Sequence, residues 1–312
     1  MKEGSEVNNL MQVMAYFSSD AVCRKHMENL RWKNGVACPF CGSMKVYRFK
    51  DGKLFKCAEK VCNKKFTVTV GTVFENTKVP LSKWFIAIYL ISSHKKGISS
   101  CQLARDISVK QQTAWFMLHR IREMMRDKEK YEFAGITECD EVFIGGKVAN
   151  MHKHIRAKIK SEGTNNKTPV LAILERGKGK VHMQVLPRVT GIELTTVIKE
   201  NVKKGTQVMT DNYSGYNSLK EDYDHQTVSH STDEYVRDKT IHTNTVEGFF
   251  SLLSRAIYGI YHQVSKKHLI RYCQESGFRY ETRASGEMER INLSLANCEG
   301  RLKYADLIAK KQ

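Results

Sequence analysis

This 312-residue chain has no long apolar run and no recognisable secretion signal. Because no apolar stretch reaches about 18 residues, no transmembrane helix is predicted. The opening residues, MKEGSEVNNLMQVMAYF, include acidic and polar side chains and have no continuous apolar core, so they do not resemble a signal peptide. Internal repeats and low-complexity segments are also missing. We therefore expect a folded protein of the cytoplasm with no membrane partner.

Acidic residues are too few to balance the basic ones. Lys and Arg number 51 against 33 for Asp and Glu, which gives a formal net charge of +18 and a pI near 9.4. A nucleic-acid-binding surface produces such an excess, because neutralisation of phosphates dominates its affinity. The charge is spread along the chain and not set on one amphipathic helix, which argues against a membrane surface. A basic protein without a polyanionic partner is the alternative on charge alone.

Four of the nine cysteines are clustered between residues 36 and 75. Two cysteine pairs on tight turns, joined by a short hairpin, can place four thiolates tetrahedrally around Zn²⁺. The predicted strands are KLFKC, residues 53–57, and KFTVTVGTVF, residues 65–74. The alternative interpretation is that these four cysteines are reduced and buried and bind no metal. The proposed zinc ligands are Cys38, Cys41, Cys57 and Cys62.

Residues 80–130 are predicted to be helical and to divide into three helices. The last two, around residues 99–107 and 110–125, are separated by a short turn at Ser108, and the third is basic. This pattern resembles a helix-turn-helix that binds DNA. An ordinary three-helix bundle with a charged solvent face is the alternative. The side chains that would face the major groove are Lys110, Gln111, Gln112 and Thr113.

Three later segments each carry one carboxylate in a well-marked context. Asp140 lies in a predicted strand, ITECDEVFIGG, Asp211 ends the strand QVMTD, and Glu247 lies on the predicted amphipathic helix IHTNTVEGFFSLLSRAIYG. Carboxylates from two strands and a later helix can converge, and hard cations such as Mg²⁺ or Mn²⁺ prefer such oxygen ligands. Two ions about 3.5–4 Å apart can activate a nucleophile and stabilise a leaving oxygen. Glu138 and Glu141 flank Asp140 and are alternatives in the assignment.

Basic and aromatic residues surround these segments. A polar stretch, residues 147–167, follows the first carboxylate strand and is predicted to be a loop that contacts the DNA backbone, with a solvated loop as the alternative. Tyr213 and Tyr216 follow Asp211, and we expect them to pack or to contact DNA, not to act as nucleophiles. The basic residues predicted to contact DNA here are Lys147, Arg156, Lys158, Lys160 and Arg255.

Several motifs together resemble one family. CPFCG, KKFTVTVGTVFENTKVPLSKWF, TAWFMLHRIR, DEVFIGGK, TDNYSGY and HTNTVEGFFSLLSRAIYGIYHQVSKKHLIRY follow in the order seen in Merlin-related bacterial insertion-sequence transposases of the acidic-triad (DDE) class, over roughly residues 15–285. The resemblance implies a zinc ribbon, a helix-turn-helix and a ribonuclease-H-like catalytic domain. It places the catalytic, Mg²⁺-binding triad on Asp140, Asp211 and Glu247.

The chain departs from this family pattern in three places. The family often has Lys seven residues after the helical carboxylate, where this chain has Ser254, with Arg255 next. Phe250 replaces a usual Trp, and the gap between the second pair of cysteines is widened. Because some members use Asn as the third catalytic residue, Asn244 is a second candidate beside Glu247.

We therefore expect a multi-domain α+β protein, with a zinc ribbon and helix-turn-helix followed by a ribonuclease-H-like mixed α/β domain. Its expected function is binding of terminal inverted repeats and metal-dependent cleavage and joining of double-stranded DNA, by a dimer or larger multimer at the bacterial nucleoid. A non-catalytic DNA-binding regulator or an inactive transposase remnant is the alternative. The expected parts are residues 1–35, helical; 36–75, ribbon; 76–130, helix-turn-helix; 131–285, catalytic; and 286–312, tail.

Overall fold

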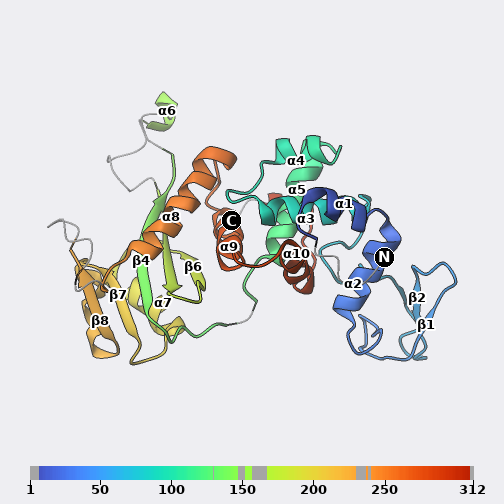
Figure 1. The fold of residues 1–312 in the computed structure, drawn as a ribbon, viewed down its shortest axis with the longest axis horizontal. Coiled ribbons are helices and arrows are strands. Elements are labelled where there is room, and N and C mark those ends of the chain that lie inside the picture. Colours follow the sequence, from blue (N-terminus) through green and yellow to red (C-terminus); the bar gives the residue numbers. More distant parts are fainter. Residues whose placement is uncertain are drawn as a thin grey trace. The chain divides into compact units, whose positions relative to one another are not determined.

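The computed structural model describes residues 7–128, 130–146, 152–156, 167–229, 237 and 240–309. The chain divides into two compact units (Figure 1). The first, here called the ribbon unit, comprises Met1–Arg126 together with Ala284–Gln312, and the second, the sheet unit, comprises Asp127–Arg283. Within the described residues, no helix is both long enough and apolar enough to cross a membrane.

Short helices form most of the ribbon unit. Their N-termini follow from the sequence, since the side chains of Asn9, Ser19 and Ser99 each accept a backbone N–H of the first turn. The third helix is apolar nearly all round and is buried at the centre of the unit, with Trp84, Phe85 and Ile88 fully enclosed. The helices are α1 (Leu10–Tyr16), α2 (Asp20–Arg31), α3 (Leu81–Ser93), α4 (Ser100–Asp106), α5 (Gln111–Met124), α10 (Glu287–Ala296) and α11 (Tyr304–Ile308).

A small antiparallel sheet in the order β1-β2-β3 forms the ribbon. Its strands are β1 (Val46–Arg48), β2 (Phe55–Cys57) and β3 (Lys65–Phe66). The predicted strand over residues 65–74 is wrong beyond Phe66, because turns follow instead. The threonines bond locally, with the Thr72 hydroxyl donating to the Thr69 carbonyl at 2.7 Å, and Gly71 adopts a positive φ of 75°. Such local side-chain bonds compete with strand pairing.

Helix α10 returns to the ribbon unit from the far end of the chain. It contacts α2, α3 and α5, with Ile291 and Leu295 buried. Backbone bonds join the same region to the segment that precedes α3, from Val73 N–H to the Cys298 carbonyl at 2.9 Å and from Gly300 N–H to the Gly71 carbonyl at 3.0 Å. Helix α10, which lies in the stretch predicted to be a C-terminal tail, therefore completes the core of this unit.

The sheet unit is built on five strands in the order β6-β5-β4-β7-β8. The first three strands along the chain pair antiparallel, whereas β7 is parallel to β4 and β8 is parallel to β7. This mixed sheet agrees with the predicted ribonuclease-H-like α/β domain and with an α+β protein as a whole. The strands are β4 (Thr137–Ile144), β5 (Thr168–Glu175), β6 (Val181–Val185), β7 (Gln207–Asp211) and β8 (Asp224–Val228).

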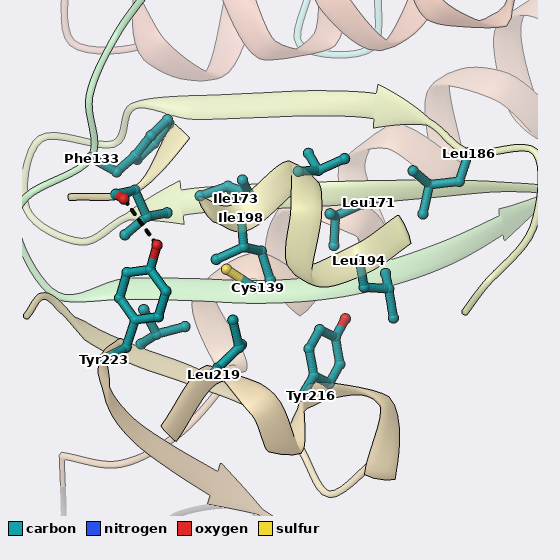
Figure 2. Packing of buried hydrophobic residues seen from close by; sticks show 13 residues of the cluster. Phe133, Cys139, Leu171, Ile173, Leu186, Leu194, Ile198, Tyr216, Leu219 and Tyr223 are labelled. Atoms are coloured by element: carbon teal, nitrogen blue, oxygen red, sulfur yellow. Dashed lines mark hydrogen bonds between the residues drawn. The ribbon is translucent and has the colours of Figure 1, made fainter. Parts of the chain in front are cut away.

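The two faces of the sheet have separate cores. On one face, Cys139, Leu171 and Ile173 of the sheet meet Leu194 and Ile198 of α7 (Figure 2). The 3₁₀ helix η3 also packs there. On the other face, apolar residues of β5 meet α8 and α9. The elements that cover the sheet are α7 (Gly191–Asn201), η3 (Ser214–Glu221), α8 (Asn244–Ala256), the π-helix η5 (Ile257–Tyr261) and α9 (Leu269–Glu281), and α6 (Lys153–Arg156) completes the described elements.

Candidate active site and zinc site

The four clustered cysteines come together as predicted. Their sulfur atoms all lie within 4.8 Å of one another. The Sγ–Sγ distance is 3.7 Å between Cys38 and Cys62 and 3.6 Å between Cys41 and Cys57. Four sulfurs bound to zinc at about 2.3 Å in a tetrahedron lie about 3.8 Å apart, so the set fits a structural zinc ion. The widened gap before Cys62 does not prevent this, because a turn closed by a bond from Cys62 N–H to the Glu59 carbonyl takes up the extra residues.

Strands β4 and β7 bring the first two predicted carboxylates to one face of the sheet. The parallel register pairs Thr137 with Val208 and Glu138 with Met209, and continuing it by two residues sets Asp140 beside Asp211. Alternation along a strand turns residues of one parity to the same side. Cys139 and Val208 enter the core under α7, so Asp140 and Asp211 face the opposite side, which α8 covers.

Helix α8 supplies the third carboxylate from its first turn. It begins at Asn244 and contacts β4 and β5 through buried Val246, Phe249 and Leu253. Glu247 is half-buried, and its Oε1 accepts a hydrogen bond of 2.8 Å from the Thr243 hydroxyl. The amphipathic pattern that predicted this helix therefore also sets which side of it rests on the sheet.

The charges of these carboxylates act on one another. Burial raises the pKa of the Asp140 carboxyl to about 8, and the negative charges of Glu141, Asp211 and Glu247, in that order of size, act in the same direction. A hydrogen bond of 2.8 Å from the Glu141 N–H to Asp140 Oδ1 opposes this rise. The negative charges near Asp140 are of the kind that a hard divalent cation would offset, because such ions prefer oxygen ligands.

Models of transposase domains match both parts of the chain. The ISXO2-like transposase domain matches residues 132–281, and the transposase zinc-ribbon domain matches residues 18–65. The chain therefore contains a transposase zinc ribbon and an ISXO2-like transposase domain. Both matches support the Merlin-related resemblance and the order of a zinc ribbon followed by a mixed α/β domain.

One known protein is similar to this chain over most of the length of both. An "Uncharacterized protein in transposable element ISH50" from Halobacterium salinarum is 27% identical over 283 residues, which cover 87% of this chain and 94% of the relative. Among solved structures, a chain of the simian T-cell lymphotropic virus intasome in complex with PP2A regulatory subunit B56 gamma matches 59% of this chain and 66% of its own length. That match has 14% identity and a TM-score of 0.28, which is too low to support an inference.

The two other acidic residues near Asp140 in this transposase have different surroundings. Glu138 is fully buried and accepts the backbone N–H groups of Thr245 and Val246 at 2.9 and 2.8 Å. Glu141 points to the face opposite Asp140, where its Oε2 accepts the Tyr216 hydroxyl at 2.6 Å. Neither interaction was visible in the sequence, although a strand period of two residues already puts Glu138 on the face of Asp140.

In the sheet unit, the other residues predicted to take part in catalysis or to contact DNA are exposed where the structure describes them. Asn244 is exposed at the first position of α8, one turn before Glu247. Arg255, in the last turn of α8, and Arg156, in α6, are exposed as well. The predictions for Lys147, Lys158 and Lys160 lie outside the described residues.

Helices α4 and α5 form the predicted helix pair. They are joined through Ser108, whose φ is +51°, and the N-terminus of α5 presents Lys110, Gln111 and Gln112 to solvent. Thr113 is half-buried. The Gln111 side chain donates a hydrogen bond of 2.8 Å to the Ser100 hydroxyl, which links the N-terminal ends of the two helices.

Proposed function

We propose that this transposase binds the ends of its element as double-stranded DNA and cleaves and joins DNA strands with the help of Mg²⁺ or Mn²⁺. The observation that supports the proposal is that Asp140 and Asp211 lie on one face of a mixed sheet and Glu247 lies in the first turn of a helix that covers this face, in a chain with a transposase domain. A non-catalytic DNA-binding regulator has no need of such a group. The net charge of +18 supports a polyanionic partner.

In this proposal the three carboxylates hold the divalent ions. Such ions, when bound, activate the attacking water or 3′-hydroxyl and neutralise charge on the phosphate. The protein contributes by fixing the oxygen ligands: Asp140 within a central strand, Asp211 at the end of its neighbour, and Glu247 on a helix that is packed against the sheet. Phosphoryl transfer of this kind depends on positioning and electrostatics, so it needs no side-chain nucleophile.

Glu247 is a better third ligand than Asn244. Its charge contributes to the raised pKa of Asp140, so it lies within electrostatic reach of that carboxylate. Asn244 is exposed and uncharged, and it lies one turn closer to the helix start. We propose that it contacts DNA or substrate and does not hold metal.

DNA recognition is assigned to the ribbon and to α5. The N-terminus of α5, with Lys110, Gln111 and Gln112 exposed, offers donors and acceptors for base edges or phosphates in a major groove. Arg255 and Arg156 are the described basic residues of the sheet unit that we assign to the DNA backbone. We further propose that the DNA-bound form is a dimer or larger multimer, because two element ends must be cut and joined together.

The test is cleavage and strand transfer in vitro on a duplex that contains the element's own ends, with and without Mg²⁺. Asp140→Asn, Asp211→Asn and Glu247→Gln should each abolish cleavage while DNA binding persists in a gel-shift assay. Asp224→Asn is the matched control, because Asp224 is an exposed carboxylate in the edge strand β8. Wild-type protein that binds the ends but never cuts them would favour the inactive remnant, and a triad variant with normal activity would contradict that residue's assignment.

A further inference from the structure

Glu138 is a carboxylate with no exposed surface, at the centre of the sheet unit. A buried charge is stable only if it is paired and fully hydrogen-bonded. Glu138 meets this condition through four donors. Its Oε2 accepts the Thr245 and Val246 N–H groups, and its Oε1 accepts the Thr245 hydroxyl at 2.7 Å and the Arg176 guanidinium.

These bonds give α8 a cap from another part of the chain. The first N–H groups of a helix have no partner within the helix, and a carboxylate there is also favoured by the helix dipole. Thr243, at the N-cap position, makes no side-chain cap bond, because its hydroxyl donates to Glu247 instead. Glu138, more than 100 residues earlier in β4, supplies the missing acceptor.

Arg176 extends this anchor to β7 and to the segment before α8. It follows β5 directly, and its side chain is only 17% exposed. Its guanidinium donates to the Thr240 and His242 carbonyls, both at 2.6 Å, and lies 3.0 Å from the Met209 sulfur. One side chain therefore contacts β4, β7 and the approach to α8.

The contacts of Glu138 and Arg176 lie one or two residues before each of the three triad residues. Glu138 precedes Asp140 by two positions in β4, and Met209 precedes Asp211 by two positions in β7, in both cases on the same face of the strand. Val246 immediately precedes Glu247. The pair thus joins the three triad-bearing elements one or two residues away from each carboxylate.

We propose that Glu138 and Arg176 are positioning residues that set the spacing of the metal-binding carboxylates. This inference rests on the proposed function of the triad. Glu138 contacts neither DNA nor metal in this proposal. Because α8 is anchored to β4 at Glu138, its removal lets the first turn of α8 shift relative to the strand, which separates Glu247 from Asp140. Without the bonds to Glu138, the apolar face of α8 would still pack against the sheet. The first turn of α8 could then slide along the helix axis relative to β4.

The test compares metal dependence in variants that remain folded. Glu138→Gln leaves Arg176 without its carboxylate partner, so the double variant Glu138→Gln/Arg176→Met is made beside it to remove both charges. Folding is checked by circular dichroism. Binding of Mn²⁺ to the protein is followed by electron paramagnetic resonance, and the Mg²⁺ concentration for half-maximal cleavage is measured. We expect both to weaken about 10- to 100-fold, the usual effect of removing a residue that orients metal ligands.

Two further comparisons test whether the ligands are displaced or the protein is generally destabilised. Excess Mg²⁺ should restore part of the cleavage rate in the Glu138 variants but none in Asp211→Asn, because the ligands are displaced and not lost. Glu275→Gln is the control, since Glu275 also forms a buried pair with an arginine, Arg279, but within α9. It should leave metal dependence unchanged.

A folded Glu138→Gln or double variant with wild-type Mn²⁺ binding and Mg²⁺ dependence would overturn the inference and leave the proposed function intact. An equal loss of metal binding in Glu275→Gln would overturn it too, because the effect would then be one of general stability. Wild-type protein that binds no Mn²⁺ and cleaves no DNA would instead overturn the proposed function.

Discussion

Replacing Tyr216 by phenylalanine removes one hydroxyl from the core of the sheet unit. Tyr216 has no exposed surface, and its hydroxyl donates to Glu141 at 2.6 Å. The ring stays in place, so no large cavity forms. What is lost is a hydrogen bond to a half-buried carboxylate that also feels the charge of Asp211.

Tyr223 provides a matched control on the same face of the sheet. It is 6% exposed, and its hydroxyl donates to the Val202 carbonyl at 3.1 Å, a neutral acceptor (Figure 2). A hydrogen bond to a charged group contributes about 1.5–3 kcal/mol and one between neutral groups about 0.5–1.5 kcal/mol. Tyr216→Phe should therefore lower the free energy of unfolding of the sheet unit by about 1 kcal/mol more than Tyr223→Phe.

Hydrogen exchange of the β4 amides measures this difference within the sheet unit. Since about 1.4 kcal/mol corresponds to a factor of ten, protection should fall roughly 10- to 150-fold in Tyr216→Phe and roughly 2- to 12-fold in Tyr223→Phe. The measurement is made without Mg²⁺, so that no cation offsets the charge of Glu141. Equal losses in the two variants, or a larger loss in Tyr223→Phe, would refute the reasoning that the charge of the acceptor decides the cost.

Zinc content and salt dependence provide two further tests. Protein purified under reducing conditions should contain one zinc ion per chain by mass spectrometry. Cys38→Ser should lose this ion and become protease-sensitive in the ribbon, because a core centred on Phe55 and Phe66 is too small to persist without metal. Full zinc occupancy in that variant would count against the site. The logarithm of DNA affinity should fall linearly with the logarithm of salt concentration, by about 0.9 for each phosphate contacted, and a flat response would contradict the electrostatic role of the basic surface.

The zinc ligands and the carboxylate-bearing elements were accessible from sequence for simple reasons. Cysteine pairs close in sequence have few ways to come together other than around a metal, and the structure confirms that the four converge. Asp211 ends the apolar strand β7, Asp140 lies within the strand β4, and Glu247 lies in the first turn of the amphipathic helix α8. The triad's catalytic role remains a prediction, but the strands and the helix that carry it are present as expected.

The role of Glu138 could not be predicted in the same way. In the sequence it is one more acidic residue beside Asp140, and nothing local distinguishes a helix cap from a metal ligand. Its partners, Arg176 and the first turn of α8, come from segments far along the chain, so only the folded sheet defines its surroundings. The turns after Phe66 escaped prediction for the opposite reason, since local threonine bonds override a strand-like pattern.

The return of α10 to the ribbon unit affects the order in which the protein can fold during synthesis. Ile291 and Leu295 complete a core whose other parts lie before Arg126, whereas the sheet unit ends at Arg283. Domains generally fold as their chains emerge from the ribosome. The sheet unit, with all three carboxylates, therefore becomes complete while the ribbon unit still waits for its last helix. The ribbon unit, most of which is synthesised first, therefore finishes folding last.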